Sequence, residues 1–228
     1  MTVRHRRTGR RLPAHHLRRT ARGKSEQSAD YSFGACLRDV DVVLDATGAE
    51  RPIVVGWSYG AALALHWATR NPDRVAGVVM VDGGYPWDYL ATVEGGRDAG
   101  REQIRTMFRR FGWALPLVRP LGMAARMSAD QHAEVNIELN EIVAESGPVF
   151  DLVTFPMRFL VATGASLGGT AEGLAAMRAT LDPVLARNPH VRFSATVASK
   201  HTTIVRKDFH AIAAAVREVA DVQHDALD

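Results

Sequence analysis

The stretch that decides the fold reads Ile53-Val54-Val55-Gly56-Trp57-Ser58-Tyr59-Gly60-Ala61-Ala62-Leu63. It begins with β-branched residues that favour a buried strand, passes through the pattern Gly-x-Ser-x-Gly, and continues with small apolar residues that favour a helix. A glycine on each side of Ser58 permits the sharp turn that would expose a serine hydroxyl between a strand and a helix. The sequence therefore predicts a strand, a tight turn and a helix, with Ser58 as a candidate nucleophile.

Further apolar runs and helical patterns surround this unit. The composition of buried parallel strands is found in four short segments, 53–57, 75–81, 158–163 and 191–197. Helical periodicity covers 34–47, 59–70, 97–111, 129–145, 171–187 and 207–220. Because strands and helices alternate, we predict the α/β class, with a mostly parallel sheet flanked by helices.

Two of these helices, 97–111 and 129–145, fall between the second and the third strand. We therefore expect a helical insertion at about 88–150 that forms a lid above the sheet. Its large apolar side chains are too numerous for an exposed pair of helices, so we expect most of them to pack, and they favour an apolar acyl or ring-containing substrate. They are Trp87, Tyr89, Phe108, Phe111, Trp113, Met123 and Met127.

The composition excludes several classes of protein. The chain has 228 residues, 46% of them hydrophobic, which is enough for one domain with a good core. Its single cysteine, Cys36, cannot form an internal disulfide, so we expect a reducing, cytoplasmic location. The sequence holds no CxxC or HExxH pattern and no uninterrupted apolar run of bilayer-spanning length, so we expect no metal, no cofactor and no membrane partner.

The basic charge is confined to the beginning of the chain. Residues 1–24 contain nine Lys or Arg and no acid, whereas the rest carries a net charge of −6. We predict that 1–24 is a disordered basic leader and that 25–228 is the folded domain. Aromatic residues do not alternate with the leader's bases, so we expect no nucleic-acid binding.

The chain resembles the α/β-hydrolase family from about residue 20 to about residue 220. The segment around Ser58 resembles the nucleophile elbow of that family, and the similarity continues through Val78-Val79-Met80-Val81-Asp82-Gly83-Gly84. Upstream, Arg22-Gly23-Lys24-Ser25 resembles the family's R-G-x-G-x-S loop with one glycine replaced. The resemblance implies a cofactor-independent serine hydrolase of small ester-like substrates.

The resemblance also implies partners for Ser58. A histidine should follow the last strand, and His201 has that position. The family's usual place for the acid, after the strand at 158–163, offers only Glu172, whereas a second arrangement puts the acid at the end of the strand after the elbow, which is Asp82. We favour Asp82 and keep Glu172 as the alternative acid; without a catalytic role, Asp82 would be a carboxylate that caps the following glycine turn. The backbone N–H of Tyr59 is the expected oxyanion-hole donor.

The beginning of the chain departs from the family pattern. No H-G loop and no strand-like run precede the segment at 53–57, so the second oxyanion donor is not identified and we expect a truncated or altered N-terminus. We also expect 53–57 to form an exposed sheet edge, through which copies of the chain could self-associate. An alternative function follows: a catalytically impaired hydrolase-like protein with a binding or self-associating role.

Overall fold

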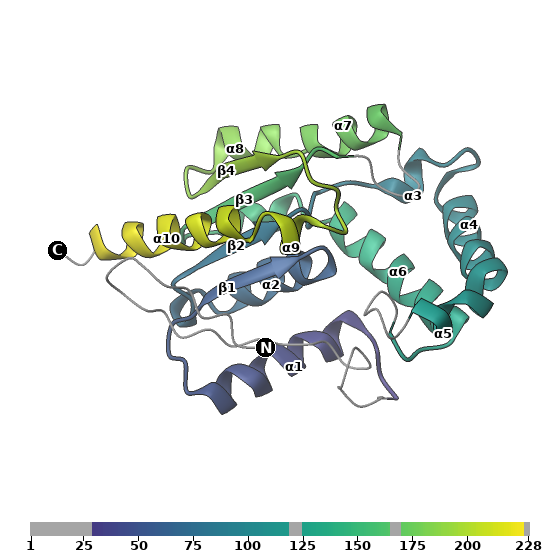
Figure 1. Ribbon diagram of the computed structural model, residues 1–228, viewed down its shortest axis with the longest axis horizontal. Coiled ribbons are helices and arrows are strands. Elements are labelled where there is room, and N and C mark those ends of the chain that lie inside the picture. Colours follow the sequence, from purple (N-terminus) through teal and green to yellow (C-terminus); the bar gives the residue numbers. More distant parts are fainter. Residues whose placement is uncertain (1–28, 119–124, 165–169, 226–228) are drawn as a thin grey trace.

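The computed structural model describes residues 29–118, 125–164 and 170–225. Within them four strands form one parallel sheet in the order β1-β2-β3-β4 (Figure 1). The strands are β1 (Ile53–Trp57), β2 (Gly77–Val81), β3 (Met157–Ala162) and β4 (Val191–Val197). The predicted α/β class with a parallel sheet is confirmed, and each predicted strand is present to within two residues at either end. The predicted leader, 1–24, lies outside the described residues.

Helices cover both faces of the sheet. Alternate residues of a strand face opposite sides, and both sides here carry apolar residues that pack against helices. On one side Met80 and Phe159 pack into the core beneath α1 (Phe33–Thr47) and α2 (Tyr59–Arg70). On the other side Val79 and Leu160 pack against α10 (Phe209–Asp225), which crosses the sheet in Figure 1. The short elements η1 (Pro72–Arg74) and α9 (Ile204–Lys207) complete the connections around the sheet. The two central strands, β2 and β3, are therefore buried on both faces, as parallel strands require, whereas β1 and β4 are partly exposed.

The helix predicted at 171–187 is divided in the structure. It consists of α7 (Ala171–Ala179) and α8 (Asp182–Arg187), and Pro183 lies in the first turn of α8. Pro183 has no N–H to donate to the Ala179 carbonyl, and its ring would clash with that carbonyl in a continuous helix, so a single helix through this position was the wrong prediction. The last helix, predicted from 207, begins at Phe209 after the separate short helix α9.

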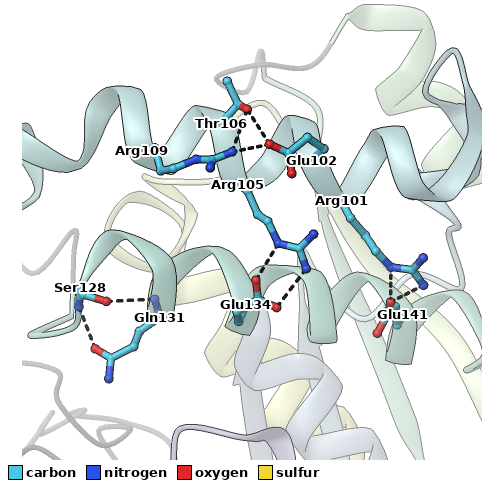
Figure 2. A network of polar contacts seen from close by, with 9 residues as sticks. All are labelled: Arg101, Glu102, Arg105, Thr106, Arg109, Ser128, Gln131, Glu134 and Glu141. Carbon is cyan, nitrogen blue, oxygen red and sulfur yellow. Dashed lines mark hydrogen bonds and ion pairs between the residues drawn. The ribbon is translucent and has the colours of Figure 1, made fainter.

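A helical segment joins β2 to β3 and lies beyond the carboxyl ends of the strands (Figure 1). It contains α3 (Tyr89–Thr92), α4 (Gly96–Phe111), η2 (Gly112–Ala114), α5 (Leu115–Val118), α6 (Ala129–Ala144) and η3 (Pro148–Leu152). Its two long helices, α4 and α6, lie side by side and are joined by the ion pairs Arg101–Glu141 and Arg105–Glu134 (Figure 2). These side chains are partly exposed, so the pairs align the helices more than they stabilise them. The segment has the position of a lid.

The apolar side chains of this segment are not all packed. Met127 is buried, and Phe108 packs against the cluster between α4 and α6. Phe111 and Trp113 are exposed, so these two side chains are exceptions to the packing expected for most of the set. Met123 lies outside the described residues.

Strand β1 forms one edge of the sheet that the structure describes. Within those residues it pairs only with β2. Val55 on this strand is 46% exposed, whereas the five residues of β2 are all buried. The predicted apolar edge is therefore present in the described part of the chain. None of the helices described is long and apolar enough to cross a membrane.

Candidate active site

Ser58 occupies a strained corner between β1 and α2. Its φ of 57° and ψ of −122° place a non-glycine residue in a region that L-residues rarely adopt. A Cβ on Gly56 would lie 2.1 Å from the carbonyl oxygen of Gly60, so the first glycine of the motif is required for the chain to turn this tightly. The Ser58 N–H donates to the Val81 carbonyl at 3.1 Å, which holds the corner against the end of β2.

Asp82 forms a second strained corner at the end of β2. Its φ is 44°, and its N–H donates to the Leu160 carbonyl at 2.8 Å. Gly83 lies against the first corner, because a Cβ there would be 2.5 Å from the carbonyl oxygen of Ser58. The two corners are therefore in direct contact at the carboxyl ends of neighbouring strands.

His201 joins the two corners. It lies in the loop between β4 and α9, and its Nε2 is 3.0 Å from Ser58 Oγ while its Nδ1 is 2.8 Å from Asp82 Oδ2. Trp57 supports this loop: its indole N–H donates to the His201 carbonyl at 3.1 Å, and the two rings lie 5.4 Å apart. The structure thus aligns a hydroxyl, an imidazole and a carboxylate in one chain of hydrogen bonds.

The surroundings favour an ionised Asp82. Its side chain is only 6% exposed, and burial by itself raises the pKa of a carboxyl group. Hydrogen bonds from His201, Tyr85 and the Ala162 N–H outweigh burial and keep the pKa of Asp82 below its usual value. An anionic Asp82 fixes the Nδ1–H tautomer of His201, so Nε2 faces Ser58 as an acceptor.

The other candidates occupy different positions. Both ring nitrogens of His201 are taken by Ser58 and Asp82, whereas Glu172 is exposed in the first turn of α7. Tyr59 is the first residue of α2, so its backbone N–H belongs to the helix N-terminus directly after Ser58. The structure therefore groups Ser58, His201, Asp82 and Tyr59, and it does not bring Glu172 to them.

Sequence reasoning missed three supporting groups. Tyr85 donates its hydroxyl proton to Asp82 Oδ1 at 2.8 Å, and the Ala162 N–H donates to the same oxygen at 3.1 Å. The third is the Trp57 indole described above. The close spacing in Asp82-Gly83-Gly84-Tyr85 was a usable signal for Tyr85, because two glycines allow the chain to bend back on itself. The Ala162 contact depends on the strand order, which the sequence pattern does not reveal.

No group of three or more His, Cys, Asp or Glu side chains that could hold a metal ion occurs in the described parts of the chain. The chemistry that the Ser58–His201–Asp82 arrangement supports is nucleophilic. A hydroxyl next to an imidazole that a carboxylate orients can attack an electrophilic carbon while the imidazole accepts its proton.

The architecture is that of a hydrolase: a parallel sheet flanked by helices, a strained turn at the serine after β1, and a helical segment above the strand ends. The family model described as alpha/beta hydrolase fold matches residues 12–105. Solved structures agree over most of the chain: an esterase from Thermogutta terrifontis has a TM-score of 0.62 at 18% identity and covers 90% of this chain and 78% of its own. NosK from Streptomyces actuosus has a TM-score of 0.63 at 20% identity, covering 91% and 85%. The chain therefore has the α/β-hydrolase fold.

Curated relatives match over short segments. A pimeloyl-[acyl-carrier protein] methyl ester esterase from Chromobacterium violaceum is 46% identical over 46 residues, which are 19% of this chain and 18% of the relative. Lipase LipV from Mycobacterium tuberculosis is 37% identical over 60 residues, 26% of this chain and 23% of the relative. The matches thus span about a fifth of the length of these relatives.

Proposed function

We propose that the protein is a serine hydrolase that cleaves small ester-like acyl substrates without a cofactor. The observation that carries the proposal is the continuous hydrogen-bonded chain from Ser58 Oγ through His201 to Asp82. The similarity of short segments to an esterase and a lipase supports the same chemistry. The substrate would enter between the strand ends and the helical segment at about 88–150, which acts as a lid.

The first half of the reaction transfers the acyl group to the enzyme. Ser58 Oγ attacks the substrate carbonyl carbon while His201 Nε2 takes the hydroxyl proton, and Asp82 stabilises the resulting imidazolium. The Tyr59 N–H donates to the developing oxyanion, an interaction whose loss costs about 10²–10³ in rate in comparable sites. The carbon–oxygen bond of the leaving group then breaks, and His201 returns the proton to the departing alkoxide.

The second half hydrolyses the acyl-enzyme. A water molecule gives its proton to His201 Nε2 and attacks the acyl carbon, and the bond to Ser58 Oγ breaks as His201 returns a proton to that oxygen. The products are one carboxylic acid and one alcohol, and the enzyme regains its starting protonation state.

A fluorophosphonate probe tests the nucleophile. We expect it to label the wild-type protein covalently and to leave Ser58→Ala unlabelled, with intact-mass spectrometry as the readout. The matched control is Ser146→Ala, which alters a serine of the α6–η3 connection. Equal labelling of wild type and Ser58→Ala would remove Ser58 from the mechanism.

A pair of acid variants tests the carboxylate. Asp82→Asn removes the negative charge next to His201, and we expect hydrolysis of a short-chain aryl ester to fall by about 10⁴, as in the equivalent change in a serine protease. Glu172→Gln, at the exposed site on α7, should retain the wild-type rate. The opposite ranking of the two variants would transfer the role to Glu172.

A second candidate function is favoured by the exposed strand β1. Copies of the chain could pair along this edge and act as a self-associating, catalytically impaired protein. Sedimentation velocity should then show a dimer that Val55→Lys converts to monomer, together with an absence of ester turnover. A monodisperse, active monomer would exclude this second function.

A further inference from the structure

The turn after β2 returns the chain to the residue at which the strand ends. Asp82 and Gly84 both have positive φ, 44° and 73°, so the backbone reverses within two residues. Tyr85 is thereby placed so that its hydroxyl lies 2.8 Å from Asp82 Oδ1, only three positions earlier in the chain. The sequence Asp-Gly-Gly-Tyr thus forms a short tether between a carboxylate and a phenol.

This tether completes the set of donors around Asp82. Oδ2 accepts from His201 Nδ1, while Oδ1 accepts from the Tyr85 hydroxyl and from the Ala162 N–H. The donors come from three different parts of the chain: the loop after β4, the loop after β2 and the end of β3. A carboxylate held at both oxygens from different directions cannot rotate without breaking one of these bonds.

The Tyr85 ring is fixed as well. The residue is 5% exposed, belongs to the main core cluster, and lies 6.4 Å from the ring of Phe159. Burial, together with the neighbouring charge of Asp82, raises the pKa of Tyr85. The hydroxyl therefore keeps its proton and stays a donor at neutral pH.

The end of β3 is anchored on its other side. Arg178 on α7 donates to the Ala162 carbonyl, and Ala162 carries the N–H that reaches Asp82. Arg178 also lies close enough to Tyr85 to act on it electrostatically. Asp82, Tyr85 and Ala162 therefore form one buried polar cluster behind the imidazole.

We propose that Tyr85 is a positioning residue of the hydrolase: its hydroxyl locks the Asp82 carboxylate in the orientation that directs Oδ2 at His201 Nδ1. The inference rests on the proposed function of Ser58, His201 and Asp82. Tyr85 does not touch the reacting atoms and acts only through Asp82. Without its hydroxyl, Oδ1 keeps a single donor, and the carboxylate turns away from the imidazole for part of the time.

The test is Tyr85→Phe, which removes one oxygen atom and keeps the ring. We expect kcat for a short-chain aryl ester to fall about tenfold with KM changed less than twofold, because the ground-state contacts with substrate remain. The pKa of Asp82, followed by ¹³C NMR of its carboxyl carbon, should rise in the variant. The control is Tyr31→Phe, in the segment before α1, which should leave both quantities unchanged.

A second variant keeps the result decisive. If Tyr85→Phe does not fold, as judged by circular dichroism, Tyr85→3-fluorotyrosine keeps the shape and makes the hydroxyl a stronger donor, and the pKa of Asp82 should then fall below that of wild type. An unchanged pKa of Asp82 with either variant, or an unchanged kcat in a folded Tyr85→Phe, would overturn the inference. Failure of the proposed function differs from both, because wild type itself would then be inert to the fluorophosphonate probe while the carboxyl titration still reports on Tyr85.

Discussion

The two glycines of the Gly-x-Ser-x-Gly motif should respond oppositely to alanine. A Cβ at position 56 would lie 2.1 Å from the Gly60 carbonyl oxygen, 2.5 Å from the Gly60 carbonyl carbon and 2.7 Å from Ala61 Cα. All three are backbone atoms of the first turn of α2, so none can move aside as a side chain would. At Gly60, in contrast, a Cβ would meet nothing within 4 Å, and this glycine does not have a positive φ.

The magnitudes follow from these distances. An ordinary contact needs at least 3.4 Å, so Gly56→Ala must separate the end of β1 from α2 by more than 1 Å. Overpacking that displaces backbone costs about 3 kcal/mol, the upper end of the usual range. Gly60→Ala places alanine in a helix without a clash, which stabilises by about 0.5–1 kcal/mol.

Urea unfolding followed by circular dichroism measures both effects, and the slope of the transition should stay constant. In a thermal scan of a chain of this size, Gly56→Ala should lower Tm by about 6–12 °C, and Gly60→Ala should raise it by about 1–4 °C. Equal stability of Gly56→Ala and wild type within about 0.5 kcal/mol, or a loss at position 60 as large as at position 56, would show that the corner is not packed as described.

Three further predictions concern other parts of the fold. Burial and then the charge of Arg70 lower the pKa of His66 to about 4, so the folded state binds this proton less readily than the unfolded state does. The free energy of unfolding should therefore be highest above about pH 6.5 and fall by about 2 kcal/mol toward pH 4, after allowance for the partial exposure of the ring. His66→Gln should flatten that fall in urea titrations at different pH values. Trp57→Phe keeps the ring near His201 but removes the indole N–H, so the initial rate of ester hydrolysis should fall about threefold; an unchanged rate would mean that the 3.1 Å bond to the His201 carbonyl has no part in positioning. Trp67 is fully buried and its indole N–H donates to Asp41 Oδ1 at 2.8 Å, so Trp67→Phe should lower the free energy of unfolding by about 3 kcal/mol. Asp41→Asn retains an acceptor and should lower it by under about 1 kcal/mol; equal losses for the two variants would contradict this account.

The sequence was sufficient for the strands because buried parallel strands have a distinctive composition. Runs such as Val78-Val79-Met80-Val81 are apolar on both faces. Both faces of such a strand are buried when helices cover the two sides of the sheet. The helical pattern at 171–187 was less informative, because the apolar periodicity continues through 180–181, where the helix is interrupted before Pro183. Prediction was therefore best where burial determines the pattern and weaker where one residue interrupts it.

For the site, residue type and chain position led to Ser58, His201 and Asp82, and the structure brings these three side chains together. Their catalytic roles remain predictions for the labelling and rate experiments. The Ala162 N–H was not predictable in the same way, since it contacts Asp82 only because β2 and β3 are neighbours in the described sheet. Tyr85 differs, because its contact with Asp82 depends on the local turn through Gly83 and Gly84. Strand order is a property of the folded chain as a whole, which local patterns do not contain.

The register of the sheet explains why the acid follows β2. Trp57 pairs with Val81, so the next residues along the two parallel strands, Ser58 and Asp82, lie side by side at about one strand spacing. Both residues have positive φ, so neither side chain follows the alternating directions of the strand residues before it, and both contact the imidazole of His201. An acid after β3 would start one strand farther from Ser58 than Asp82 does. A one-residue shift between β1 and β2 would separate the corners, which makes the pairing of these two strands as important to the site as the identities of the side chains.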